Sequence, residues 1–426
     1  MRIVEVTGEI ANMPHSSVNN IDNGEGAKLP RRDWILMPML GLLTICLVAL
    51  SVNSIASRMY SASQSTVYSC LTENDQLVAA WGIPNTICMQ KDFETELSEY
   101  RFNGCGHRAG MECGPKPPGT FRIVVIGSSV AFGMSVPREK SFAGLLPAEL
   151  SSRVGRRIEI YNVAMINGFP CSVALHLDEA FAAQPDMILW ALTSPDIGHS
   201  SVDDSYTAPP SIAKLGISAR MQYRVTRLLA ASNVQQAIIT AWDLHRDQWV
   251  TRLWKTPSGI LLNHLLYASQ RQYMKSFLMS SDGESGFLKM DPSDKWRDNL
   301  LHFDRDVAQI TSRTRAAGVP LVATYLPSRG QATMISMNEW PTGYDPYELD
   351  HELRSIITSY GGIYLDVLPS FRNVHDLQAD YYAVEGHPNA RGHAIFATLL
   401  AERLTSGSVP ALTVAAQPQV ESKESR

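Results

Sequence analysis

The sequence lacks the patterns that would point to nucleic acid, to a nucleotide or to a repeat architecture. Its 426 residues carry a net charge of −5 and no dense stripe of lysine and arginine, so nothing favours a nucleic-acid partner. No repeat of fixed period stands out. No Walker pattern occurs, and the turn GSSVAFG at residues 127–133 is not the GxGxxG of a dinucleotide-binding loop.

Cysteine is scarce, and no two cysteines form a CxxC pair, which makes a zinc site a weak alternative. Cys46 lies in an apolar stretch, and Cys171 stands alone. The other four are clustered before the first strong strand pattern: Cys70, Cys88, Cys105 and Cys113. In an oxidising compartment such a cluster predicts two disulfides, with three pairings open.

Charge is absent from one stretch, residues 34–52, which reads WILMPMLGLLTICLVALSV. A helix needs about 20 mostly apolar residues to cross a bilayer core, so this stretch predicts a transmembrane anchor. Pro38 falls near its start, where a missing N–H costs least. A cleaved signal peptide ending near Ala56 is the alternative. The length of the apolar run and the long polar segment before it favour the anchor.

Basic residues flank this stretch unequally. Lys28, Arg31 and Arg32 precede it, and only Arg58 follows closely. The positive-inside rule then places the N-terminus in the cytoplasm and everything after Val52 outside. We therefore expect a single-pass protein of the inner (cytoplasmic) membrane.

The rest of the chain divides by composition. Residues 1–33 read as a disordered cytoplasmic tail and 406–426 as a loose C-terminal tail. Residues 53–119 read as an extracytoplasmic connecting region that ends in the turn-rich GPKPPGT. Residues 120–405 form the main domain.

Within the main domain, short apolar runs alternate with amphipathic helical patterns, which predicts an α/β fold with a doubly wound parallel sheet. The runs are FRIVVIG (121–127), IEIYNVA (158–164), DMILWAL (186–192), PLVATYL (320–326) and IYLDVL (363–368). The expected helices cover residues 139–152, 172–183, 300–317, 347–360 and 389–404. A helical insertion at about residues 199–298 has no clear strand but carries several aromatics, among them Trp242, Trp249 and Trp254. These could form an extra packed layer or a lid over the sheet, and the pattern favours neither.

Two short motifs fall where an open α/β sheet binds its ligands, beyond the carboxyl ends of strands. The first strand runs into Gly127-Ser128-Ser129, so a serine would lie at that edge with helix N–H groups beside it. Near the C-terminus, Glu385 precedes His387 by two residues. An acid so placed can orient an imidazole, which can take a proton from a serine. Either motif alone would be unremarkable.

Together these motifs resemble the SGNH (GDSL-type) hydrolase superfamily over residues 121–404. The resemblance implies a flavodoxin-like five-stranded sheet, Ser129 as nucleophile, His387 as base and Glu385 as its acid. It also implies an oxyanion hole formed by the N–H groups of Ser129 and of Gly168, the latter in NVAMINGFP. The segment RFNGCGHR at 101–108 is similar to the one that precedes the catalytic domain in exported members.

The chain departs from the family pattern at three positions. Ser128 replaces the usual aspartate before the nucleophile, and Glu385 replaces an aspartate, with Asp380 a possible substitute acid. In the family's third sequence block, which follows the third strand, Pro195 stands where the family has an asparagine donor. Proline has neither a side-chain donor nor an N–H. We expect that Thr193 or Ser194 replaces that donor, that the backbone donors suffice, or that activity is weak.

The resemblance implies a membrane-anchored ester hydrolase or O-acyltransferase that acts outside the cytoplasm on acylated cell-surface carbohydrate, without a cofactor or a metal. The membrane, an acylated glycan or other ester, and a polysaccharide-assembly machinery are the partners that it suggests. One alternative is a non-catalytic module that binds or assembles a surface polysaccharide. Another is a lipid esterase or thioesterase.

The membrane topology can be tested with reporter fusions. A reporter fused after Arg426 should behave as exported, and one fused before Trp34 as cytoplasmic, because the basic flank holds the N-terminus inside. Paired reporters, each active on only one side of the membrane, measure this. The reverse result would overturn both the topology and the oxidising compartment that the disulfides need.

Overall fold

The computed structural model describes residues 32–60, 66–73, 79–200, 256–279 and 285–413. The chain divides into two compact units, residues 1–54 and 55–426. Almost all of the expected N-terminal tail, the end of the C-terminal tail and the insertion residues Trp242, Trp249 and Trp254 lie outside the described residues.

The apolar stretch near the N-terminus forms one helix, α1 (Asp33–Met59), of 27 residues. At 1.5 Å per residue it is about 40 Å long, against a bilayer core of about 30 Å. Among the described residues it is the one helix long and apolar enough to cross a membrane. The predicted segment 34–52 therefore lies inside a longer helix, whose length and composition suit an anchor or a signal sequence.

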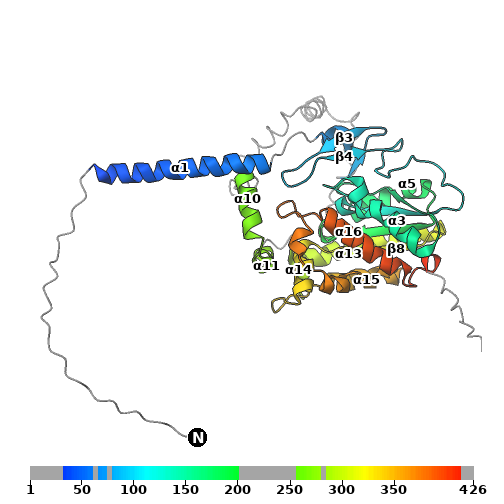
Figure 1. The fold of residues 1–426 in the computed structure, drawn as a ribbon. Helices are drawn as coiled ribbons and strands as arrows, with labels where there is room; N and C mark the ends of the chain where they lie inside the picture. The colour runs from blue at the N-terminus through cyan, green and yellow to red at the C-terminus, as the bar shows by residue number, and fades with distance from the viewer. Residues whose placement is uncertain (1–31, 61–65, 74–78, 201–255, 280–284, 414–426) are drawn as a thin grey trace, which may run out of the picture. The chain divides into compact units, whose positions relative to one another are not determined.

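The second unit is built around a five-stranded parallel sheet with the strand order β6-β5-β7-β8-β9, of which Figure 1 labels β8. The strands are β5 (Phe121–Gly127), β6 (Ile158–Asn162), β7 (Met187–Leu192), β8 (Leu321–Tyr325) and β9 (Ile363–Leu365). The first four are buried along their whole length, as expected of strands covered on both faces. The predicted five-stranded parallel sheet is confirmed. Its last strand is shorter than predicted because the chain turns into the 3-10 helix η7 (Leu368–Asn373).

Helices cover both faces of the sheet. On one face α3 (Phe142–Val154) packs against α16 (Ala390–Thr405). The crossovers that run the other way along the sheet place their helices on the opposite face, as right-handed connections require. These are α4 (Pro170–Leu175), α5 (Leu177–Ala182), α13 (Asp294–Ala316) and α15 (Glu348–Ser359). The single helix predicted over 172–183 is in fact two helices that meet at His176.

Two further parts of the unit differ from the sequence prediction. The insertion contributes α10 (Pro257–Leu266) and α11 (Gln270–Leu278), and α11 packs on α14 (Arg329–Met337), a helix that the sequence did not predict. After α16, the side chains of Val409 and Leu412 are buried, so the domain continues past residue 405 into the predicted loose tail.

The region before the sheet, predicted only as a connection, forms two antiparallel strand pairs. These are β1 (Leu71–Glu73) with β2 (Ala80–Gly82) and β3 (Ile87–Gln90) with β4 (Ser98–Arg101). Tyr100 and Phe102 are buried in the same core as the sheet. This region is therefore part of the folded domain. The sequence does not predict its strands, because strands of three or four residues show no clear alternation of apolar and polar residues.

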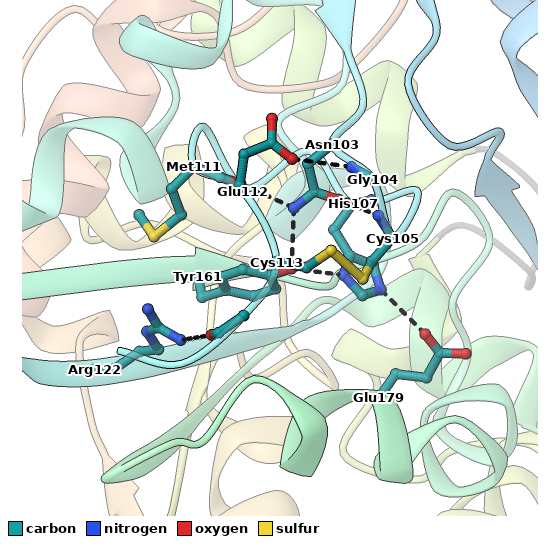
Figure 2. The surroundings of a disulfide bond; sticks show 11 residues. Asn103, Gly104, Cys105, His107, Met111, Glu112, Cys113, Arg122, Tyr161 and Glu179 are labelled. Carbon is teal, nitrogen blue, oxygen red and sulfur yellow. Dashed lines mark hydrogen bonds and ion pairs between the residues drawn. A yellow bond between two sulfur atoms is a disulfide. The ribbon is translucent and has the colours of Figure 1, made fainter. Parts of the chain in front are cut away.

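Two disulfides close this region, joining Cys70 to Cys88 and Cys105 to Cys113. Figure 2 shows the second bridge beside Asn103, whose side-chain amide donates to Tyr161 Oη at 2.9 Å. His107 lies 3.1 Å from the same hydroxyl and 3.2 Å from Glu179. These contacts attach the bridged loop to β6 and α5. The prediction of two disulfides is confirmed, with one of the three pairings selected.

Peptide mapping of the unreduced native protein should recover Cys70 with Cys88 and Cys105 with Cys113. Removing either bridge, as in Cys88→Ser or Cys113→Ser, should lower the free energy of unfolding by about 2–4 kcal/mol, mainly because the unfolded chain gains freedom. Cys171→Ser is the control, since Cys171 belongs to no bridge. Recovery of any crossed pair in native material would show the pairing to be wrong.

Candidate active site

β5 places a serine at the carboxyl edge of the sheet. The strand ends at Gly127, whose φ is +138°, and α2 (Ser129–Phe132) begins two residues later. A Cβ on Gly127 would lie 2.4 Å from the carbonyl oxygen of Ala191 on β7, so only glycine fits this turn. Ser129 is therefore the first residue of a helix at the point where the strand order reverses, which is where such sheets bind ligands.

Arg108, from the region before the sheet, supports this turn. Its buried guanidinium donates to the carbonyl oxygens of Phe132 at 3.1 Å, Gly133 at 2.6 Å and Val136 at 2.7 Å. The guanidinium also lies 4.1 Å above the ring of Tyr100. Burial lowers the pKa of Arg108 to about 10, so it stays charged at neutral pH. The end of α2 is thus held by a cation from outside the sheet.

The histidine lies in a tight loop before α16. The N–H of Tyr382 donates to the carbonyl oxygen of His387 at 2.9 Å, and the N–H of Gly386 donates to that of Tyr382 at 3.2 Å. Gly386 has a φ of +86°, which glycine adopts without strain. Asn389 then caps α16 by accepting from the N–H groups of Arg391 and Gly392. The motif EGHPN therefore encodes a loop and a helix cap that fix the imidazole.

The structure brings Ser129, His387 and Glu385 together. Nε2 of His387 lies 2.7 Å from Oγ of Ser129. On the other side of the ring, Oε1 of Glu385 lies 2.7 Å from Nδ1, at an angle outside hydrogen-bond geometry. The carboxylate is thus a close counter-charge here, and catalytic contacts of this kind often align only when substrate is bound.

Ser135 orients Glu385, and no sequence pattern indicated it. Its hydroxyl donates to Oε1 of Glu385 at 2.9 Å, while the N–H of His387 donates to Oε2 at 3.0 Å. Ser135 is itself buried with a φ of +66°, and its N–H donates to Tyr100 Oη at 2.8 Å. A residue in a loop after α2 therefore fixes the acid of a loop 250 residues later.

The electrostatics favour a proton-accepting imidazole. Burial works to lower the pKa of His387, but Glu385 and the charge of Asp92 outweigh it, and the pKa is raised. Asp92, in the loop after β3, has its own pKa raised by burial and by the charge of Glu385. The charge of His387 in turn works to lower the pKa of Asp196 and that of His393. The carboxylates of Glu385 and Asp92 stabilise the imidazolium that proton transfer would create.

Backbone donors for an oxyanion lie near Ser129. The N–H of Ser129 is in the first turn of α2, where N–H groups have no partner within the helix. Gly168 packs so closely that a Cβ there would lie 2.7 Å from the carbonyl oxygen of Gly127. In this structure the N–H of Gly168 donates to Met165 at 3.2 Å, a long hydrogen bond.

Thr193 and Ser194, the expected substitute donors, are engaged elsewhere. The N–H and hydroxyl of Thr193 donate to Oδ2 of Asp196 at 2.7 and 2.9 Å, forming a capping box at the start of α6 (Ser194–Gly198). The side chain of Ser194 is buried, and it works to lower the pKa of Tyr325. Pro195 is exposed at the donor position. The idea that one of these hydroxyls replaces the missing asparagine is therefore not supported.

Asp196 instead interacts with residues of the loops after β5 and β7. It is buried, and its Oδ2 accepts from Thr193. Burial raises the pKa of Asp196 to about 6, although the hydroxyl of Ser128, the residue that replaces the family's aspartate, and the groups of Thr193 work to lower it. Ser128 thus acts on Asp196, while its neighbour Ser129 contacts His387.

Two neighbouring residues do not take part in this arrangement: Asp380, the substitute acid considered from sequence, and His393, the next histidine along the chain. Asp380 is paired with Arg391, whose Nε lies 3.0 Å from Oδ1. His393 is buried between α3 and α16, where its Nδ1 accepts from the N–H of Phe142 at 3.2 Å. Burial lowers the pKa of His393 to about 3. Neither can replace Glu385 or His387 in this arrangement.

Comparison with known proteins gives similar folds only. No family model and no curated protein matches the chain. TesA is 9% identical, with 67% of this chain and 98% of that chain covered and a TM-score of 0.34. An extracellular lipase from Streptomyces rimosus is 12% identical, with 66% and 99% covered and a TM-score of 0.31. A GDSL-like lipase from Parabacteroides merdae is 11% identical, with 69% and 96% covered and a TM-score of 0.33.

Their names are of the kind that the sequence motifs resemble, but likenesses with TM-scores of 0.31–0.34 and identities of 9–12% carry no functional argument. The functional conclusion rests on the geometry of Ser129, His387 and Glu385 in this chain.

Ester turnover should depend on the protonation of His387. The value of kcat/KM should rise with pH through an apparent pKa above about 6.5, the ordinary histidine value, because only the neutral imidazole can accept the proton of Ser129. Glu385→Gln should move this limb to lower pH, since it removes a charge that raises the pKa of His387. Asp376→Asn, which alters an exposed carboxylate, is the control. An unmoved limb in Glu385→Gln would contradict the assignment.

Proposed function

We propose that the second unit is a serine-dependent ester hydrolase or O-acyltransferase of the SGNH type. The observation that supports it is the 2.7 Å contact between Ser129 Oγ and His387 Nε2, with Glu385 2.7 Å from the other ring nitrogen. A nucleophile, a base and an orienting acid in this order define acyl transfer through a covalent intermediate.

In the proposed reaction Ser129 Oγ attacks the ester carbonyl carbon while His387 takes the hydroxyl proton. The N–H groups of Ser129 and Gly168 stabilise the oxyanion of the tetrahedral intermediate. His387 then gives its proton to the leaving alkoxide, and an acyl-serine remains. Water or a second hydroxyl, deprotonated by His387, attacks the acyl-serine and frees Ser129. Water as acceptor gives hydrolysis, and an alcohol gives acyl transfer.

We propose further that the reaction takes place outside the cytoplasm on acylated carbohydrate of the cell surface. The apolar helix α1 with its basic N-terminal flank supports an inner-membrane anchor in that orientation. The two disulfides support an oxidising compartment. The glycan and any polysaccharide-assembly partner come from the family resemblance and from this location.

A non-catalytic polysaccharide-binding module is the second candidate, and Pro195 favours it. Pro195 offers no donor where the family has an asparagine, the hydroxyl of Thr193 is bonded to Asp196, and Ser194 is buried. Loss of one oxyanion donor costs a rate factor of about 10²–10³, however, which weakens an esterase without abolishing it. Labelling of the serine by a mechanism-based probe separates the two.

A fluorophosphonate probe should label the wild-type protein at Ser129, and Ser129→Ala should lose both labelling and hydrolysis of aryl esters. Ser128→Ala should retain labelling, because the hydroxyl in contact with His387 is that of Ser129. Labelling followed by mass spectrometry of the modified peptide measures this. Absence of labelling in folded wild-type protein would favour the binding module.

The dependence of turnover on the length of the acyl chain would then separate acetylated glycans from lipid esters as substrates.

A further inference from the structure

The loop that carries Glu385 and His387 rests on a buried carboxylate from another part of the chain. Glu94 lies in the turn between β3 and β4, and its side chain is only 3% exposed. Its Oε1 accepts from the N–H of Ala383 at 3.0 Å. Its Oε2 accepts from the N–H groups of Val384 and Glu385, both at 2.8 Å. One carboxylate therefore takes up three consecutive backbone donors.

These bonds are of the stronger kind, because the acceptor is ionised and shielded from water. Burial works to raise the pKa of Glu94, but His264 and the N–H groups of Glu385 and Val384 outweigh it, so the pKa is lowered. Glu94 is thus a carboxylate at neutral pH. Without it, the three N–H groups would lack these acceptors, and a buried donor left unsatisfied destabilises the loop that carries it.

The hydrogen bonds to Glu94 directly affect the position of Glu385. Glu385 is both one of the three donors, through its N–H, and the counter-charge of His387, through its side chain. The same turn supplies Asp92, whose charge also acts on His387. On its outer side Glu94 Oε1 lies 2.7 Å from Nε2 of His264 in α10. The carboxylate therefore lies between the histidine loop and the insertion.

We propose that Glu94 is a positioning residue for the reaction of Ser129: it fixes the backbone of residues 383–385 so that Glu385 stays beside His387. The β3–β4 turn, which lies outside the five-stranded sheet, is thereby part of the active site. His264 orients Glu94 from the insertion side. This inference rests on the proposed function for its effect on catalysis, but the support of the loop can be measured without any turnover.

The first measurement is amide hydrogen exchange of the full-length protein, read on a peptide that contains residues 383–385. Glu94→Ala should accelerate exchange in this peptide while peptides of β5 and β7 keep their protection. Glu96→Gln is the matched control, because it removes a surface carboxylate of the same turn, paired with Lys140 at 2.7 Å, and leaves the histidine loop untouched. Unchanged exchange at 383–385 in Glu94→Ala would overturn the proposal.

The second measurement is the pH profile of kcat/KM. Glu94→Ala should lower kcat/KM by roughly a hundredfold, the usual effect of a small misplacement of a catalytic group, mainly through kcat. The acid limb should move towards about 6.5, because Glu385 then raises the pKa of His387 less. Glu94→Gln keeps one oxygen acceptor, so it should lie between wild type and Glu94→Ala. Equal effects of the two variants would show that only the charge of Glu94 matters, and would overturn the positioning role.

A purely structural role predicts something different. In that case Glu94→Ala would lower the melting temperature and the amount of folded enzyme, but the folded fraction would keep the wild-type limb and kcat, and the proposal would be wrong. If wild-type Ser129 fails to react with the fluorophosphonate, the proposed function fails, and the exchange comparison still decides whether Glu94 holds the loop. Where Glu94→Ala does not fold, Glu94→Gln supplies the same comparison with a smaller expected change.

Discussion

The hydrogen bond between Ser129 and His387 joins parts of the chain that are 258 residues apart, and the rest of the site depends on it. It exists because the sheet is parallel. All five strands end at one edge, and the order reverses at β5, so the loops after β5, β6 and β7 meet there. The helix pair α3 and α16 then sets the distance, because α3 follows the serine loop and α16 follows the histidine loop.

A parallel sheet alone does not fix two loops to within hydrogen-bond distance, and the region before the sheet provides the remaining constraints. Arg108 holds the end of α2 behind the serine, and Glu94 holds the loop before the histidine. Both are buried charges that bond to backbone atoms, which a flexible surface side chain could not do with the same precision of placement. Their own positions depend on strand pairs of three or four residues. The disulfides that close those strands therefore restrict the two residues that fix the site.

The parts predictable from sequence were those with a local cause. Buried parallel strands read as unbroken apolar runs, and so β5 to β8 were found close to their observed ends. The nucleophile turn and EGHPN were found because glycine, serine and histidine stand at strand ends. Glu94, Asp92 and Ser135 left no such signal, because a carboxylate or hydroxyl in a loop is ordinary until folding brings it beside a distant backbone or ring. The strand pairs before the sheet leave no signal for another reason: strands of three or four residues are too short to show a clear alternation.

The third block shows how a departure from a motif can preserve one role and lose another. Asp196 keeps a structural role: it is buried, and it caps α6 through its hydrogen bonds with Thr193. Pro195 gives up the donor role, and the capping box itself keeps Thr193 from taking it over, since its hydroxyl is already bonded to Asp196. In the proposed mechanism, the backbone N–H groups of Ser129 and Gly168 then stabilise the oxyanion without a side-chain donor. Enzymes typically accelerate reactions by about 10⁶-fold or more, so the loss of about 10²–10³ for one donor leaves ample room for catalysis. A proline at this position therefore argues for slow acyl transfer. Only a failure of Ser129 to react would argue that the protein does not catalyse acyl transfer at all.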